Sequence, residues 1–200
     1  MRIILTIVGI VLIVIAGVIP MLFEMRTARA AQLLKPGDLA PTFSSEMVLG
    51  GEIQPVKLSD FRGKKLILYF YPKDNTSGCT KEACAFRDGF ARFQSAGFAI
   101  LGCSVDSAES HKSFIRKYSL PFPLLLDRDH KIAEAYGVAN GIPILGLDRR
   151  ITYVIDEQGR ILKVYPRVDP AVHASEIIRD LDIGPASTKP AMAPGVKPAG

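Results

Sequence analysis

The chain has 200 residues, a formal net charge of +5 and a sequence pI near 9.2, with three cysteines, three histidines and no tryptophan. Lysine and arginine are interleaved with aspartate and glutamate, which favours a mildly basic solvated surface over a nucleic-acid partner. Three cysteines do not make a disulfide framework, and neither a Cys-x-x-Cys pair nor ligand-like histidine spacing is present, so we expect no metal and no cofactor. Redox chemistry at one or two cysteines remains.

An uncharged apolar run, Ile3–Phe23, opens the chain and is long enough to cross a hydrocarbon core of about 30 Å. We predict an uncleaved transmembrane anchor over residues 1–24, with the folded domain on the periplasmic (extracytoplasmic) side. The alternative is a signal peptide, because Ala28-Arg29-Ala30 forms an A-x-A pattern before Ala31, which would export the domain after cleavage. Three basic residues follow the run and one precedes it, the reverse of the positive-inside rule for an exported domain, so the topology stays open.

A linker is predicted over 25–40, a single folded domain over 41–184 and a disordered tail over 185–200. The tail is rich in Pro, Ala, Gly and Lys and has no aromatic or β-branched run to bury. The remaining length of about 150 residues is enough for one sizeable core.

Apolar runs alternate with helix-like segments through the predicted domain. A hairpin is expected over 46–58, around Gly50-Gly51. Strands are expected at 65–70, 98–104, 123–126, 151–156 and 160–166, and helices at 79–96, 107–119, 130–136 and 170–181. Near-continuous apolar strands joined by helices indicate an α/β fold whose central sheet is covered on both faces, and the closing hairpin makes that sheet mixed.

Cys79 lies just past the strand expected at 65–70, where the next helix begins. Chemistry in such sheets gathers at the carboxyl ends of strands. Free backbone N–H groups and the positive end of the helix dipole at that point favour a thiolate over a thiol. Pro72 stiffens the exit from the strand, and Gly78 lets backbone come close to the sulfur. Thr76 offers a hydroxyl, either as a helix cap or as a donor to a substrate oxygen.

The spacing Pro72-x-x-x-Thr76-x-x-Cys79 resembles the active-site motif of the peroxiredoxins. The fuller stretch "FYPKDNTSGCTKEACAFRD" is similar to the bacterioferritin-comigratory (PrxQ-type) subgroup, and "LKPGDLAPTF", "LSDFRGKKLILYFYP" and "LLLDRDHKIAEAYGV" follow the family's order. The resemblance runs from about residue 35 to residue 183 and implies a thioredoxin-like fold. Ser77 stands where this subgroup usually has proline, so we expect a less stiff loop before Cys79.

The resemblance also implies roles for individual side chains. Cys79 is the peroxidatic cysteine, which attacks the O–O bond of a hydroperoxide and becomes a sulfenic acid. Cys84 matches the resolving cysteine of members with Cys-x-x-x-x-Cys and forms an intramolecular disulfide. Arg150 matches the arginine that holds the thiolate and peroxide oxygens, with Arg149 as the alternative if the register is off by one. Glu82 either orients that arginine or is an ordinary solvent-facing charge near the helix N-terminus.

The cysteine spacing predicts a conformational change. Residues five apart in an intact helix are rotated by about 140°, and their Cα atoms lie beyond the roughly 7 Å limit of a disulfide, so the first turns after Cys79 must unwind. Without Cys79 beside it, Cys84 would be interpreted as a small buried hydrophobe. Cys103 is expected to be only a core residue, and His111 and His130 are expected on helix surfaces.

The leading hypothesis is a monomeric thiol peroxidase. Its substrates would be hydrogen peroxide and organic hydroperoxides, and a thioredoxin-like dithiol would recycle it. Two alternatives remain. The first is a membrane-tethered dithiol–disulfide oxidoreductase, which would need a Cys-x-x-Cys motif, whereas four residues separate the two cysteines here. The second is a non-catalytic adaptor domain in which the cysteines are incidental.

Overall fold

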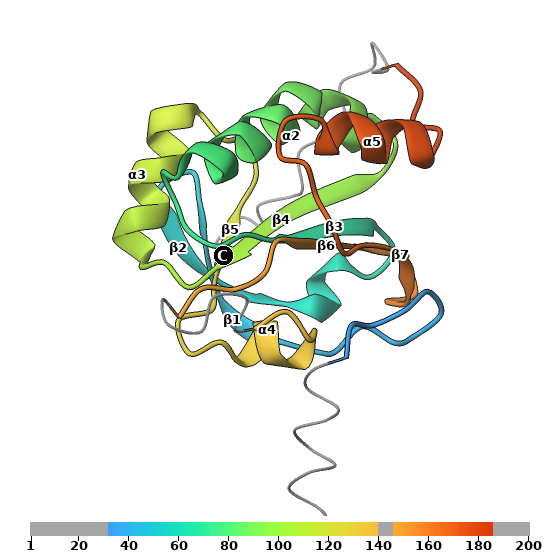
Figure 1. Cartoon of the computed structure of the whole chain (residues 1–200), viewed down its shortest axis with the longest axis horizontal. Coiled ribbons are helices and arrows are strands. Elements are labelled where there is room, and N and C mark those ends of the chain that lie inside the picture. Colours follow the sequence, from blue (N-terminus) through green and yellow to red (C-terminus); the bar gives the residue numbers. More distant parts are fainter. Residues whose placement is uncertain (1–31, 140–145, 186–200) are drawn as a thin grey trace, which may run out of the picture.

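The computed structural model describes residues 32–139 and 146–185 (Figure 1). The elements, in chain order, are β1 (Ser44–Leu49), β2 (Glu52–Lys57), the 3-10 helix η1 (Leu58–Phe61), β3 (Lys65–Phe70), α2 (Ser77–Ser95), β4 (Phe98–Ser104), α3 (Ala108–Tyr118), β5 (Leu124–Leu126), α4 (Lys131–Ala135), β6 (Ile151–Ile155), β7 (Ile161–Tyr165) and α5 (His173–Asp180). Each strand and helix predicted within the folded domain is present, with ends shifted by a few residues.

The strands form one mixed sheet in the order β2-β1-β5-β4-β3-β6-β7. β3 pairs in parallel with β4, and β4 in parallel with β5, whereas β6 runs antiparallel to β3 and β7 antiparallel to β6. β1 is antiparallel to both β2 and β5. The predicted α/β architecture with a mixed central sheet is therefore confirmed.

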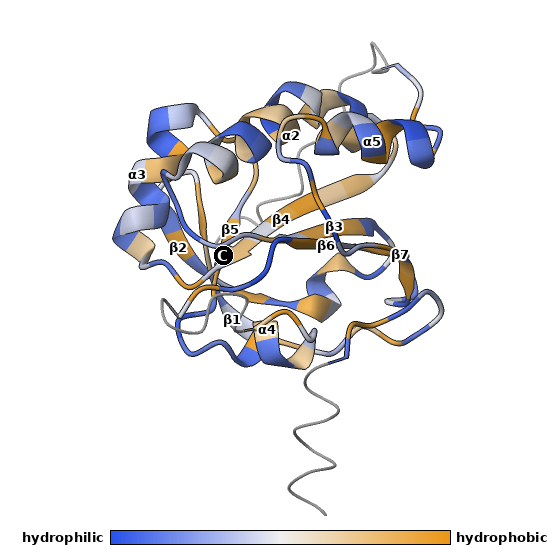
Figure 2. Ribbon diagram, in the orientation of Figure 1, coloured by the Kyte–Doolittle hydropathy of each residue, from blue (hydrophilic) through white to orange (hydrophobic). Residues whose placement is uncertain are grey.

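The sheet is buried on both faces, which explains why its central strands are continuously apolar. Along β3, Ile67 and Tyr69 belong to the core cluster beneath α2, α3 and α5, whereas Leu66, Leu68 and Phe70 belong to the cluster on the side of α4. Figure 1 shows these helices on opposite sides of the sheet, and Figure 2 shows its hydrophobic central strands. Both cores fix the end of β3, from which the chain enters α2.

Part of the predicted linker is built into the fold. The backbone N–H of Gly37 donates to the carbonyl of Ile161 at 2.8 Å, and the N–H of Ile161 donates to the carbonyl of Asp38 at 2.8 Å. Leu33 and Leu34 pack against the core cluster on the side of α4. An open strand edge presents unpaired backbone groups, so this pairing covers part of the edge of β7.

The predicted N-terminal anchor and most of the predicted tail lie outside the described residues. Within residues 32–139 and 146–185, no helix is long and apolar enough to span a membrane.

Candidate active site

Cys79 lies in the first turn of α2, immediately beyond the carboxyl end of β3. Thr76 is the N-cap residue, and Cys79 is the third helical residue after it. Its side chain is 1% exposed and belongs to the core cluster beneath α2. All three cysteines are free thiols, and Cys84 is half-buried five residues further along the same helix. The sulfur therefore sits near the positive end of the helix dipole, in a nearly dry environment.

Arg150 reaches Cys79 because of the register between β6 and β3. The two strands are antiparallel, and Ile151 at the start of β6 pairs with Phe70 at the end of β3. Arg150, the residue before Ile151, therefore lies beside the start of α2. Its Nη2 is 3.0 Å from the sulfur of Cys79. Arg149 is not part of this contact, because its Nη2 donates to the carbonyl of Gly137.

Glu82 lies one helical turn after Cys79, is fully buried and forms an ion pair with the Nη1 of Arg150. Burial raises the pKa of this carboxyl to about 7, although Arg150 acts in the opposite direction. Burial alone would lower the pKa of Arg150, but Glu82 and Cys79 raise it above its ordinary value. The guanidinium therefore stays charged and presents one nitrogen to the sulfur and another to the carboxylate, which suits it to stabilise an anionic sulfur or oxygen.

The turn before Cys79 leaves space for the guanidinium. A Cβ added to Gly78 would lie 3.4 Å from the Nη2 of Arg150 and 3.6 Å from the Cγ of Pro170. The hydroxyl of Thr76 donates to the carbonyl of Lys73 at 3.0 Å and does not cap the helix through its side chain. Pro72 is half-buried where the chain leaves β3. Both distances are ordinary van der Waals contacts, so the approach of Arg150 does not require glycine at position 78. The Thr76 hydroxyl stabilises the turn itself.

Sequence reasoning missed a buried polar cluster behind this turn. Asp74 is 4% exposed, accepts hydrogen bonds from the Tyr71 hydroxyl at 2.8 Å and the Ser110 hydroxyl at 2.7 Å, and lies 2.9 Å from the Nδ1 of His111. His111 is fully buried, so the expectation that it lies on a helix surface was wrong. Its partner is 37 residues away, too far for a local sequence pattern to reveal. His130 is also only partly exposed, and its Nδ1 lies 2.9 Å from the Oδ1 of Asp148.

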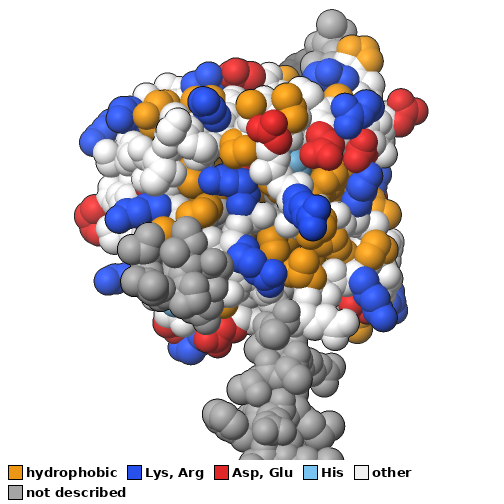
Figure 3. All heavy atoms as spheres, viewed as in Figure 1, with side chains coloured by type: hydrophobic (Ala, Val, Ile, Leu, Met, Phe, Trp, Pro, Cys, Tyr) orange, Lys and Arg blue, Asp and Glu red, His pale blue; other side chains and the backbone are white. Residues whose placement is uncertain are grey.

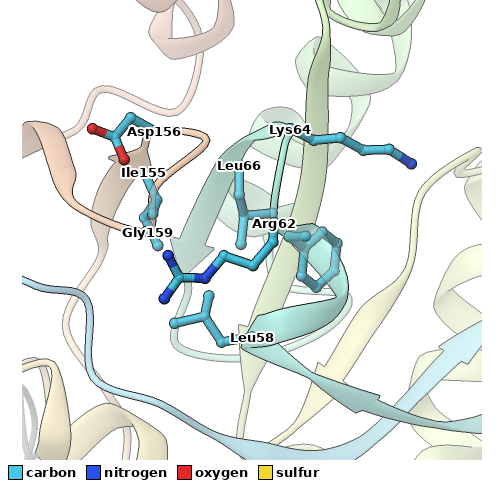
Figure 4. A pocket seen from close by; sticks show the side chains of 8 residues that line it. Leu58, Arg62, Lys64, Leu66, Ile155, Asp156 and Gly159 are labelled. Carbon is cyan, nitrogen blue, oxygen red and sulfur yellow. The ribbon is translucent and has the colours of Figure 1, made fainter.

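Two other features do not belong to the site. Cys103 in β4 is fully buried, and burial raises the pKa of its thiol well above the ordinary value, which makes it the inert core residue that was expected. The hollow in Figure 4 lies at the opposite end of β3, where the side chain of Arg62 extends toward Gly159 between Leu58 and Ile155. No cluster of three potential metal ligands occurs within the described ranges.

The buried carboxyl of Glu82 gives a testable pH dependence. Because its folded-state pKa of about 7 exceeds its ordinary value of 4.5, its contribution to stability is fully present below 4.5 and is lost as the pH rises through 7. At about 1.4 kcal/mol per pKa unit, the loss amounts to roughly 3 kcal/mol. Glu82→Gln should remove this decline from the free energy of unfolding of the reduced protein, measured in denaturant at several pH values. The exposed Glu52→Gln is the control, and an identical decline in wild type and Glu82→Gln would contradict the assignment.

Comparisons with known proteins agree with this geometry. A family model described as the AhpC/TSA family matches residues 36–164. A putative peroxiredoxin bcp of Coxiella burnetii is 44% identical over 150 residues, covering 72% of this chain and 97% of the relative. Peroxiredoxin Bcp of Bacillus subtilis is 44% identical over 137 residues, covering 66% of this chain and 87% of the relative.

The basic groups on the face drawn in Figure 3 are interspersed with acidic and apolar side chains and form no continuous basic surface there.

A crystal structure of a mutant of Xylella fastidiosa PrxQ superposes with a TM-score of 0.68 at 30% identity, covering 76% of this chain and 97% of that one. The expected thioredoxin-like fold is shown by the structural likeness. With a matching family model over most of the folded part and two relatives named Bcp at 44% identity, the chain belongs to the AhpC/TSA family, as a peroxiredoxin of the Bcp/peroxiredoxin Q kind, and peroxiredoxins are thiol-dependent peroxidases.

Proposed function

We propose that this peroxiredoxin reduces hydrogen peroxide and organic hydroperoxides with Cys79 as its nucleophile. The observation that carries the proposal is the contact of 3.0 Å between the Nη2 of Arg150 and the sulfur of Cys79, made at the first turn of α2. A permanently charged donor at this point stabilises the thiolate before reaction. The same donor is placed to stabilise the negative charge that grows on the peroxide oxygens as the O–O bond breaks.

In the first step, the thiolate of Cys79 attacks one peroxide oxygen and the O–O bond breaks. The sulfur is oxidised to a sulfenic acid, and the other oxygen leaves with the bonding pair and takes a proton, giving water or an alcohol. Arg150 needs no displacement for this step, because Glu82 already fixes its second nitrogen. Thr76 and Pro72 shape the turn that presents the sulfur.

In the second step, the thiol of Cys84 attacks the sulfenic sulfur of Cys79, which forms a disulfide and releases water. Both residues lie in α2, where an intact helix holds their Cα atoms beyond the roughly 7 Å disulfide limit, so the helix must open. A thioredoxin-like dithiol then restores both thiols by exchange. The two alternative functions, a dithiol–disulfide oxidoreductase and an adaptor domain, draw no support from this site.

We further propose that the enzyme works as a monomer, anchored by residues 1–24 with its domain outside the cytoplasm. The uncharged run Ile3–Phe23 supports the anchor. The full-length protein should then remain with membranes after an alkaline carbonate wash, because a spanning helix inserts almost irreversibly. Recovery of a soluble form that begins at Ala31 would replace the anchor with a cleaved signal peptide.

The two cysteines should give different mutant signatures. Cys79→Ser should abolish peroxide reduction, because a serine hydroxyl is not ionised by the local field that ionises a thiol. Cys84→Ser should leave the first oxidation fast but trap a sulfenic acid, which a dimedone-type probe detects, and should make Cys79 prone to overoxidation. Cys103→Ser is the control and should retain turnover. Peptide mapping that joins Cys79 to Cys103 or to a second chain would refute the role of Cys84.

Adjacent arginines provide a matched test of the donor. Arg150→Ala should slow the oxidation of Cys79 by peroxide by about tenfold or more, because the donor to the sulfur and to the developing oxyanion is lost. Arg149→Ala removes a guanidinium that bonds to the carbonyl of Gly137 and should leave this rate within about twofold. Single-turnover kinetics with the reduced variants measure both rates, and the reverse order would refute the assignment.

A further inference from the structure

Helix α3 holds the chain just before the segment that carries both cysteines. Asp74, the last buried residue before that segment, contacts Ser110 and His111 near the start of α3, and its N–H donates to the Oδ2 of Asp106 at 2.8 Å. The Nε2 of His111 lies 3.3 Å from the carbonyl of Leu125. His111 therefore joins the turn at Asp74 to β5 as well as to α3.

The same helix holds the chain just after the two cysteines. The Nη1 of Arg87 donates to the carbonyl of Tyr118, the last residue of α3, at 2.9 Å. The preceding residue, Phe86, is fully buried, with its ring centroid 4.8 Å from that of Tyr69 and 5.6 Å from that of His173. From Phe86 onward, α2 is therefore fastened both to the core and to the end of α3.

Between these two attachments, several features make the helical conformation less stable. Its first residues, Ser77 and Gly78, are poor helix formers. Within the described residues, the Thr80 Oγ1 and the Glu82 Oε1 are buried side-chain oxygens without a hydrogen-bond partner. Unwinding would give both oxygens access to water, which offsets part of the lost helical structure. Asn75, at the start of this stretch, has a left-handed backbone conformation with a φ of 59°.

We propose that α3 acts as a fixed frame that confines the opening of α2 to Asn75–Ala85. Asp74 and Arg87 are the positioning residues at its two ends, and His111 and the carbonyl of Tyr118 are their partners. The frame lets Cys84 reach Cys79 while the rest of the molecule stays folded. This inference rests on the proposed function of Cys84, whose thiol attacks the sulfenic acid of Cys79, so that one disulfide forms and one water leaves.

Hydrogen exchange of the reduced and disulfide forms tests the frame directly. One equivalent of hydrogen peroxide produces the oxidised full-length protein, and peptide mapping identifies its disulfide. With the Cys79–Cys84 bond confirmed, amides of 75–85 should exchange at least about tenfold faster than in the reduced form, whereas those of 88–95 and of α3 should be unchanged. Faster exchange across α3 or 88–95 would overturn the frame alone. Absence of the Cys79–Cys84 bond would overturn the proposed function and the frame with it.

Matched variants test each end of the frame. Arg87→Gln should extend the fast exchange of the oxidised form into 88–95. Arg92→Gln should not, although Arg92 makes the same kind of contact, with its Nη2 donating to the carbonyl of Ile183 at 2.6 Å. His111→Gln should extend fast exchange into the first turns of α3, whereas His130→Gln, which also removes an aspartate-paired histidine, should not. Equal exchange within either pair would contradict that end of the frame, and the wild-type comparison stands even if a variant fails to fold.

A kinetic readout separates the frame from general stability. Thr80→Val keeps the shape of this half-buried side chain but removes the buried, unpaired hydroxyl, which should make the closed helix more stable. Formation of the disulfide should slow by about fivefold and overoxidation of Cys79 should increase, while its first oxidation stays within about twofold. Thr80→Ser keeps the hydroxyl and is the control. An unchanged rate of disulfide formation in Thr80→Val would show that the weakness of this segment does not set the opening, and would overturn the inference.

Discussion

One buried guanidinium connects the parts of the active site. Arg150 reaches Cys79 with one nitrogen and Glu82 with another, and its side chain is only 17% exposed. A buried arginine needs anionic partners, and the protein supplies a carboxylate and a sulfur on the same face of α2, one helical turn apart. The contact therefore depends on the helix being wound, because only a wound helix brings Glu82 and Cys79 onto one face.

This dependence links chemistry to conformation. In the proposed mechanism, the wound helix assembles the site for attack on peroxide, and the same winding keeps Cys84 away from Cys79. Opening the helix breaks the contacts of Arg150 with both side chains and exposes a carboxyl whose burial is costly, as its pKa of about 7 indicates. In the mechanism proposed here, the catalytic cycle alternates between a wound and an open state of about ten residues, while the sheet and the remaining helices stay unchanged.

Much of this arrangement follows from local sequence signals. Strands buried on both faces form continuous apolar runs such as residues 66–70, and the turn before Cys79 is marked by proline and glycine. The sheet, the helices and the position of Cys79 were therefore predictable. Arg150 was found through family resemblance, since spacing alone did not separate it from Arg149. The antiparallel register of β6 against β3 provides the physical reason for its place beside the sulfur.

The buried polar contacts were not predictable in the same way. Asp74 and His111 are far apart in the sequence and meet only because β4 lies next to β3, which brings the start of α3 beside the turn. Histidine is intermediate in its tendency to be buried, so no local rule indicated the burial of His111. Glu82 was left open between two roles for a similar reason, because an acidic residue in a first helical turn is stabilised by the helix dipole whether or not it has a partner.

The proposed mechanism requires that the folded site accelerates the attack of Cys79 on peroxide. Rapid quenching of the reduced protein with a thiol-alkylating reagent, after mixing with one equivalent of hydrogen peroxide, measures how fast each cysteine is oxidised. Cys79 should react at least about a hundredfold faster than a free cysteine thiolate at the same pH, because a preorganised donor stabilises the charge that develops. A rate no faster than that of the free thiolate would contradict this mechanism.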